Sequence, residues 1–252
     1  MSANMMSLAS SGGKFLKLFG DRKMMKTMPT ARDYVQDGLI HQWDGIENAA
    51  FDTHDINSSV WKDIKGGFDF SLDSRYGFGT NSFICKTPNT RGLAKRVSFD
   101  GFGTPTIEVC YSYSESDFVA GYLFGIQGDG FSIGMNYSTS NGKVFTRTNG
   151  VHQGYLTLGL HSASLVCTNE AMSSTKNYYY QFIDGSQNLR ADYIPITSSS
   201  VSLQLMKTTT VGSSYNMCIH SVRIYNRRLS AFEIAANYAI DKARFNLPDK
   251  TI

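Results

Sequence analysis

Short stretches of alternating apolar and polar residues recur along most of the chain after residue 34. In one of them Ile107, Val109 and Tyr111 alternate with more polar neighbours, and this two-residue period is typical of a β-strand with one face in a core. Further stretches of this kind lie at 121–126, 131–137, 144–148, 155–160, 162–168, 178–183 and 201–206. Asn-Gly and Asp-Gly dipeptides separate several of them and favour tight hairpin turns. The pattern predicts an all-β protein.

The hydrophobic period changes near the end of the chain. Residues 218–225 alternate as a strand, with Cys218, Val222 and Ile224 expected on one face. Ser230 is followed three residues later by Glu233, and this spacing is that of a capping box, in which each side chain accepts a hydrogen bond from the other residue's backbone amide. A helix is therefore predicted at about 231–244, ending before Pro248.

Three motifs give the chain a family resemblance. The sequence RIYNRRLSAFEIAANY at 223–238 resembles the C-terminal signature of laminin G-like jelly rolls, which belong to the concanavalin A-like lectin and glucanase superfamily. DGLIHQWDGIEN at 37–48 and VWKDIKGGFDFSL at 60–72 are similar to earlier motifs of that family, in which Trp43 and Trp61 are expected in the core. The resemblance implies a two-sheet antiparallel jelly-roll sandwich over 34–252, with a short C-terminal helix and an N-terminal extension.

Composition agrees with one large domain. The chain has 252 residues, of which 41% are hydrophobic and 18% charged, so it can bury a substantial core as a single all-β unit. A net charge of +3 is too small to indicate nucleic acid as the main partner. The four cysteines include no CxxC pair, so a zinc site is not expected.

Residues 1–33 form a segment of different character. They hold six basic and two acidic residues, which accounts for the whole positive excess of the chain. Residues 1–13 are small and polar without the pattern of a secretory leader, and the part after them is amphipathic. We expect the segment either to dock into a larger protein assembly or to pack on its own sandwich. The residues of this assembly arm are Lys14, Phe15, Leu16, Leu18, Phe19, Lys23, Met24 and Met25.

Hydrolysis of a glycan would require particular acidic residues in the sequence. Retaining glycosidases of this superfamily require two carboxyl groups about 5 Å apart, which alternate acids on a strand can supply. The chain has one acidic pair at that spacing, Glu115 and Asp117, in a serine-rich stretch expected to be a solvated loop. A GxSxG match at 130–134 lies within a strand pattern, whereas a nucleophile elbow needs a following helix. We therefore predict no enzymatic activity, with a glycoside hydrolase or lyase as the alternative.

Two sets of residues remain as candidates for ligand binding. Asp52, Asp55 and Asn57 gather oxygen atoms in one loop, which suits calcium, although the spacing is not that of an EF-hand. No other cofactor is expected. Aromatic side chains predicted at the rim could form a platform for sugars, and they are Phe51, Tyr76, Phe78, Phe102 and Tyr179.

These expectations combine into one hypothesis. The sandwich would be a non-catalytic recognition or decoration module that binds a glycan or a protein, anchored by its arm to a larger assembly. The resembling sequences are of a type found in gut bacteria and their bacteriophages, so a virion or a bacterial cell surface is the expected location. A purely structural virion protein is the second hypothesis, and a glycoside hydrolase or lyase is the alternative from another class.

Overall fold

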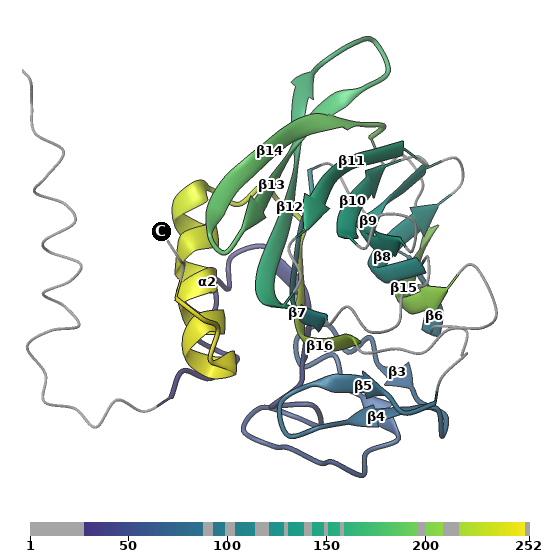
Figure 1. Ribbon diagram of the computed structural model, residues 1–252, viewed down its shortest axis with the longest axis vertical. Helices are drawn as coiled ribbons and strands as arrows, with labels where there is room; N and C mark the ends of the chain where they lie inside the picture. The colour runs from purple at the N-terminus through teal and green to yellow at the C-terminus, as the bar shows by residue number, and fades with distance from the viewer. Residues whose placement is uncertain are drawn as a thin grey trace, which may run out of the picture.

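Two antiparallel sheets lie face to face, and a helix covers the outer face of one of them (Figure 1). The computed structural model describes residues 28–87, 93–98, 104–113, 121–128, 131–138, 143–148, 151–156, 159–195, 200–208 and 217–249. The predicted all-β sandwich with a C-terminal helix is confirmed.

The first sheet has eight strands, one of which lies off the main path. The order along the path is β14-β13-β12-β7-β16-β5-β4, and β1 also pairs with β16. Their bounds are β14 (Ser186–Tyr193), β13 (Asn177–Ile183), β12 (Gly159–Ala171), β7 (Thr106–Tyr113), β16 (Met217–Tyr225), β5 (Phe83–Cys85), β4 (Tyr76–Phe78) and β1 (Leu39–Asp44). The C-terminal strand β16 thus lies at the centre, between segments that are far apart in sequence.

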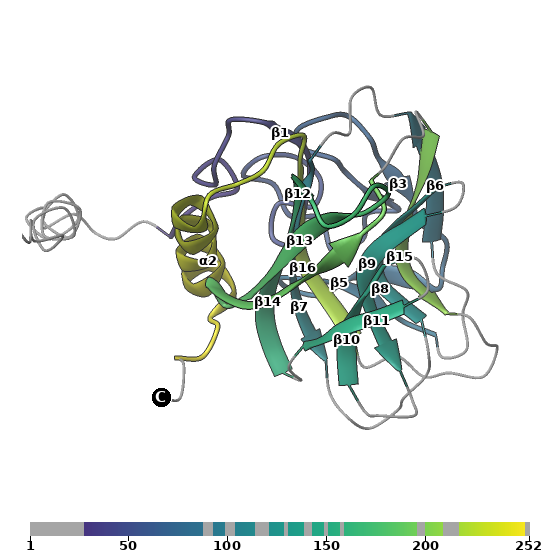
Figure 2. The ribbon, with the colours of Figure 1, turned by 90° about the horizontal axis from the view of Figure 1, so that it is seen from above.

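The second sheet has six strands in the order β11-β10-β9-β8-β15-β6. Their bounds are β11 (Val151–Leu156), β10 (Lys143–Thr148), β9 (Phe131–Ser138), β8 (Gly121–Gly128), β15 (Ser200–Thr208) and β6 (Leu93–Ser98). A separate pair, β2 (Val60–Trp61) and β3 (Phe70–Ser71), lies near one end. Seen from above, helix α2 (Ala231–Phe245), the first sheet and the second sheet follow one another as layers (Figure 2).

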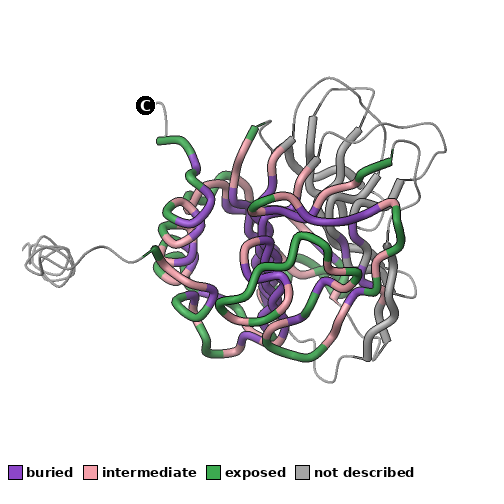
Figure 3. Tube along the Cα trace, turned by 90° about the horizontal axis from the view of Figure 1, so that it is seen from below, coloured by how far each residue is buried: buried purple, intermediate pink, exposed green. Residues whose placement is uncertain are grey.

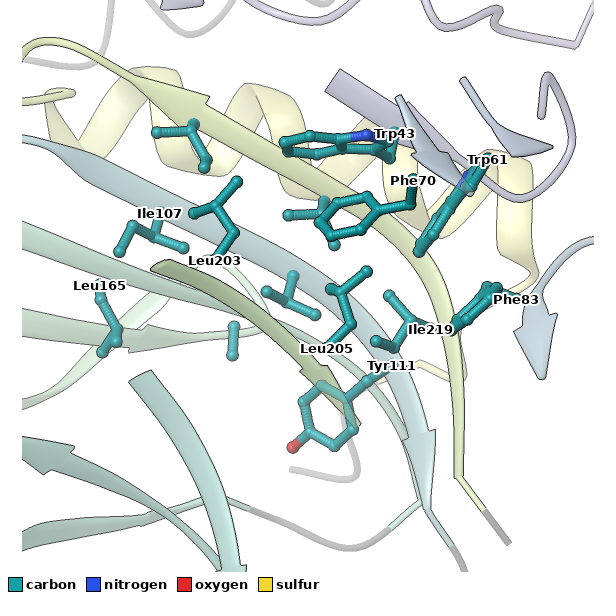
Figure 4. Packing of buried hydrophobic residues seen from close by; sticks show 14 of the residues in the cluster. Trp43, Trp61, Phe70, Phe83, Ile107, Tyr111, Leu165, Leu203, Leu205 and Ile219 are labelled. Carbon is teal, nitrogen blue, oxygen red and sulfur yellow. The ribbon is translucent and has the colours of Figure 1, made fainter. Parts of the chain in front are cut away.

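Side-chain alternation on β7 separates two environments. Ile107, Val109 and Tyr111 point into the core between the sheets, and Figure 4 shows Ile107 and Tyr111 in that cluster with Leu203 and Leu205 of β15. The intervening Glu108 and Cys110 face helix α2, where Cys110 packs with Phe245. A fully buried apolar side chain of this size contributes about 1.5–3 kcal/mol to stability. The two-residue period thus places one face of β7 in the apolar core and the other under the helix.

Two tryptophans close the core near the β2–β3 pair. Trp43 and Trp61 are both 0% exposed, as their motifs predict. The indole N–H of Trp61 donates to the carbonyl of Asp44 at 2.9 Å, and that of Trp43 donates to the carbonyl of Phe68 at 3.0 Å. Figure 3 shows buried residues along the strands next to helix α2. The indole N–H of each ring has an acceptor, so both rings are buried without leaving an unpaired donor.

β-Bulges change which residues of two strands face the core. The register of β16 shifts between Ile219 and Ser221, so Ile219 joins Val222 and Ile224 in the core. Strict alternation predicts Cys218 in the core, and this prediction was wrong, because Ile219 takes that place. An extra residue in one strand reverses the alternation on one side of it. A shift in β1 between Leu39 and His41 acts in the same way.

Helix α2 has the predicted cap. The Ser230 hydroxyl accepts from the Glu233 amide, and the Glu233 carboxylate accepts from the Ser230 amide at 2.8 Å. Arg227 also binds this carboxylate. The helix ends at Asn246, whose φ of 58° is left-handed and is tolerated by asparagine. Among the described residues there is no helix long and apolar enough to span a membrane.

The N-terminal segment joins the sandwich before residue 34. The amide of Ala31 donates to Glu47 at 2.7 Å, and its carbonyl accepts from Gln42 at 2.8 Å. Arg244 also donates to the carbonyl of Pro29. The last residues of the predicted arm are therefore part of the packed sandwich. The arm residues from Lys14 to Met25 lie outside the described part of the chain, so their docking role stays a prediction.

Candidate functional site

The predicted aromatic platform is largely part of the core. Tyr76 and Phe78 are each 3% exposed and Tyr179 is 0% exposed, so these three cannot present a ring to a sugar. Strand alternation on β13 buries Tyr179 and turns its two tyrosine neighbours outward. Phe51 is half-buried, with the Arg32 guanidinium 4.5 Å from its ring centroid. Phe102 lies outside the described residues.

The loop predicted to bind calcium uses its oxygen atoms internally. Asp52, at a left-handed φ of 59°, pairs with Arg32 at 3.3 Å, and Asp55 accepts from the Asn57 amide at 2.9 Å. Within the described part of the chain there is no group of three His, Cys, Asp or Glu side chains placed to hold a metal. The turn is thus closed by its own hydrogen bonds, and calcium stays a prediction.

A buried ionic network lies between helix α2 and the first sheet. Arg223 on β16 donates to Glu108 at 2.9 Å and, through two nitrogens, to Asp241 of the helix at 2.8 and 2.7 Å. The Tyr34 ring lies over its guanidinium, 3.9 Å from the centroid, and the Tyr34 hydroxyl donates to Asp241. Asn237 adds a bond to Glu108. Arg223 and both carboxylates are at most 1% exposed.

A second buried network adjoins the first at the C-terminal end of the helix. Arg244 donates to Asp44 at 2.7 Å and to Glu47 at 2.8 Å. Burial raises the pKa of Asp44, as it does that of Glu108, and the neighbouring arginine offsets only part of that effect. These acids fix the helix to the sheet, and their burial keeps them from any substrate. The acid pair Glu115 and Asp117 lies outside the described residues.

A different pair of titratable groups lies at the start of β12, where both side chains are partly exposed. His161 Nδ1 and Asp184 Oδ2 are 2.7 Å apart, and the two side chains are 16% and 17% exposed. Asp184 lies in the turn between β13 and β14, and its other oxygen accepts from the Ser162 amide at 3.0 Å. Since the aspartate is held by the backbone of β12 itself, its orientation toward His161 is fixed.

The contact determines which nitrogen of His161 can accept a proton. An ionised carboxylate only accepts hydrogen bonds, so Nδ1 carries the hydrogen that is donated to Asp184. The basic lone pair is then on Nε2, as in other histidines oriented by a carboxylate. Tyr111 is the cross-strand neighbour of His161, with ring centroids 6.2 Å apart. Burial, and next Asp184, raise the pKa of Tyr111, so its phenol stays protonated at neutral pH.

Sequence reasoning missed this pair. His161 and Asp184 are 23 residues apart and match no short motif of a metal or catalytic site. The Asp-Gly dipeptide at 184–185 does predict the turn, where Asp184 has a φ of 50° and Gly185 a φ of 72°. The sequence does not show that β12 pairs with β13, and this pairing brings the turn that holds Asp184 close to the start of β12.

Comparisons with known proteins give structural likeness only. No protein-family model matches the chain, and no curated protein matches its sequence. Solved structures do match. A Trypanosoma rangeli sialidase in complex with sialic acid is 15% identical with a TM-score of 0.55, over 85% of this chain and 34% of that chain. A mutant of that sialidase displaying trans-sialidase activity is 13% identical, with a TM-score of 0.54 over 82% of this chain and 33% of that chain.

The alginate lyase Aly36B differs in how much of its length is matched. It is 12% identical with a TM-score of 0.50, over 77% of this chain and 99% of that chain. This chain spans only about a third of the sialidases but nearly the whole of the lyase. At these identities the likeness shows the fold, a β-sandwich shared with proteins that act on glycans.

The comparisons correct the functional prediction. A non-catalytic recognition or decoration module was expected, with a virion as its assembly, and enzymatic activity was predicted to be absent. The matched structures are instead sialidases and an alginate lyase, and they give no support to a virion. The prediction considered the paired carboxylates of a glycosidase and a serine nucleophile, but it did not consider an acid–base pair built on histidine.

Proposed function

We propose that this chain is a glycan-processing enzyme that cleaves a carboxylated polysaccharide by β-elimination, with His161 as the proton-accepting group. The observation that carries the proposal is the 2.7 Å contact between His161 Nδ1 and Asp184 Oδ2 at a partly exposed end of the sandwich. A histidine held in one tautomer by a carboxylate is the usual arrangement of a general base near neutral pH.

The likeness to solved structures supports the substrate class. The sialidase is in complex with sialic acid and the lyase acts on alginate, and both of these glycans bear carboxylates. Elimination is favoured over hydrolysis by a pair of carboxyl groups, because both members of such a pair must be accessible to the substrate. In the described part of the chain, Asp44, Glu108 and Asp241 are all engaged by buried arginines.

The proposed step needs no cofactor and conserves atoms and charge. His161 Nε2 takes the proton from the ring carbon next to the uronate carboxylate. The electron pair of that bond forms a carbon–carbon double bond, and the bond from the neighbouring carbon to the glycosidic oxygen breaks. The leaving oxygen takes up a proton from water, and the imidazolium of His161 then returns its proton to the resulting hydroxide. The products are a new chain end and an unsaturated uronate. Asp184 stabilises the imidazolium that forms in the step.

We further propose that the sandwich belongs to the laminin G-like branch of its superfamily. The capping box of Ser230 and Glu233 and the buried positions of Trp43 and Trp61 support this assignment, because all four residues lie in the motifs that carry the resemblance.

The test is an activity assay on a panel of polymers. Purified protein is incubated with alginate, other polyuronates and a neutral polysaccharide, while new chain ends and the ultraviolet absorbance of the unsaturated uronate are recorded. The proposal predicts both signals on at least one polyuronate and neither on the neutral polymer. New chain ends without the absorbance would mean hydrolysis and would overturn the elimination step, and no signal on any polyuronate would overturn the proposal as a whole.

A further inference from the structure

An arginine–tyrosine surface lies at the opposite end of β12 from His161. It consists of Glu170 on β12, Tyr178 and Tyr180 on β13, Arg190 on β14 and Arg228 in the loop before helix α2. Tyr178 and Tyr180 are two positions apart, so both project from the same side of the sheet. Arg190 is the cross-strand partner of Tyr180. The two arginine side chains are each 48% exposed, so this is an open face of the molecule.

The arginines of this surface are held in place rather than extended into solvent. The Arg190 guanidinium carbon is 3.7 Å from the Tyr178 ring centroid, and that of Arg228 is 5.3 Å from the Tyr180 centroid. Glu170 lies between them and accepts from Arg228 at 2.8 Å, from the Tyr180 hydroxyl at 2.9 Å and from Arg190 at 3.3 Å. Stacking and a shared carboxylate reduce the side-chain freedom that ligand binding would otherwise remove.

Both guanidinium groups keep donors for a ligand. Each has five N–H groups, and the contact with Glu170 uses one nitrogen of Arg190 and one of Arg228. The Tyr180 and Arg228 hydrogen bonds lower the pKa of Glu170, so it is ionised at neutral pH. Two arginines then face one carboxylate and the surface carries a net positive charge. The adjacent Lys176 and Asp192 pair with each other at 2.7 Å and leave that balance unchanged.

We propose that this surface is a second glycan-binding site, which takes the carboxylate groups of an acidic polysaccharide. The proposal rests on the proposed function for its substrate class. Arginine matches a carboxylate with two parallel N–H groups, and two arginines on one open face offer this contact twice. A neutral glycan would gain little here, because the faces of Tyr178 and Tyr180 are already covered by arginine.

Position separates this surface from the proposed catalytic pair. Glu170 and His161 are nine positions apart on β12, which is roughly 30 Å at 3.3 Å per residue. They also lie on opposite faces of the sheet, because the cross-strand partner of Tyr180, Val166, packs under helix α2, whereas Tyr111 beside His161 belongs to the core between the sheets. The surface therefore holds a distant part of a long polymer and raises its effective concentration at the catalytic end.

The test measures binding without cleavage. Full-length protein carrying His161→Gln is run through native gels that contain a polyuronate or a neutral polysaccharide. A second protein adds Arg190→Gln and Arg228→Gln, and a matched control adds Lys62→Gln and Arg75→Gln, which removes two exposed charges elsewhere. We expect the polyuronate to retard the parent and the control alike. The arginine variant should bind about tenfold more weakly, with a difference that shrinks as salt rises.

The outcomes keep the two proposals apart. Equal retardation of the arginine variant and the control by the polyuronate would overturn this inference. Equal retardation of the parent by the neutral polymer and by the polyuronate would overturn it as well. Either result would favour a protein as the partner of these arginines. Cleavage of polyuronates by the unaltered protein would still stand in that case. Weaker binding by the arginine variant together with no cleavage of any polyuronate would support the surface and overturn the catalytic proposal.

Discussion

Two groups of charged side chains on the first sheet lie in opposite environments. Under helix α2, Glu108 and Asp241 are bound by Arg223, and all three are at most 1% exposed. At the start of β12, His161 and Asp184 are 2.7 Å apart, and about a sixth of each side chain is exposed. The first group is closed to solvent, whereas part of each side chain in the second remains exposed.

The comparison shows why a perturbed pKa alone is a poor guide to a catalytic site. Burial raises the pKa of Glu108 in the same way that an enzyme would raise that of a general acid. Here the cause is the packing of a helix on a sheet, and a buried ion pair of this kind is a structural element. His161 differs from these buried acids in two ways: its side chain is partly exposed, and its contact with Asp184 fixes its orientation.

The largest expected effect breaks the buried network. Arg223→Met leaves Glu108 and Asp241 without their cation in a dry environment, and we expect a loss of about 3–5 kcal/mol in the free energy of unfolding. Denaturant unfolding measures it, with the exposed Arg190→Met as the matched control, expected within about 0.5 kcal/mol of the parent.

Since Arg223→Met can fail to fold, Arg223→Lys provides a second test. It keeps the charge but loses the planar fork that binds Asp241 through two nitrogens, so its stability should lie between the parent and the Met variant. A loss below about 1 kcal/mol for Arg223→Met would mean that the network does not hold the helix.

The next effect concerns the orientation of His161. Asp184→Asn removes the carboxylate that fixes the imidazole tautomer, and we expect the rate on polyuronate to fall about 10²-fold or more. Circular dichroism should show that the fold is kept, and Asp73→Asn, at an exposed ion pair, should retain the parent rate. An unchanged rate in Asp184→Asn would show that Asp184 has only the structural role of closing its turn.

A smaller effect is expected at the helix cap. Ser230→Ala removes the acceptor of the Glu233 amide and should cost about 1 kcal/mol of stability, measured by denaturant unfolding. Ser71→Ala, at an exposed position of β3, is the matched control and should have no measurable effect. A cost as small as that of the control would show that packing alone fixes the start of α2.

The smallest effect is a dependence of stability on pH. The Arg227 hydrogen bond lowers the pKa of Glu233 from 4.5 to about 2. A depressed folded-state pKa contributes stability above the unfolded value, and that stability is lost as pH falls. We expect about 0.5–1 kcal/mol to disappear between about pH 4.5 and pH 2. In Glu233→Gln this part of the pH dependence should be missing, and an identical acid profile of both proteins would contradict the assignment.

Local patterns in the sequence predict the architecture well. Alternation on β7 and the capping box at Ser230 are local signals, and the structure has both. The exceptions are also local in cause. A bulge near Ile219 exchanges the faces of β16, and no residue type marks it. Tyr179 was expected at the rim because three consecutive tyrosines do not show which of them faces the core.

The candidate site depends on contacts that the sequence does not display. The pairing of β12 with β13 brings Asp184 to His161, and strand order is set by the packing of the whole sandwich. The same holds for the contacts of Arg223 with Glu108 and Asp241, because the three residues lie on three separate elements, β16, β7 and α2. Individual residue types were visible in the chain, but their partners were not.

The most direct test of the central claim is the rate of polyuronate cleavage by His161→Gln, compared with the parent and with His54→Gln. His54 is an exposed loop histidine whose Nδ1 lies 3.1 Å from a backbone carbonyl, so its variant controls for the loss of a histidine. The account predicts that His161→Gln loses 10²- to 10⁴-fold in rate with its fold intact, while His54→Gln keeps the parent rate. Equal rates for the three folded proteins would contradict the account.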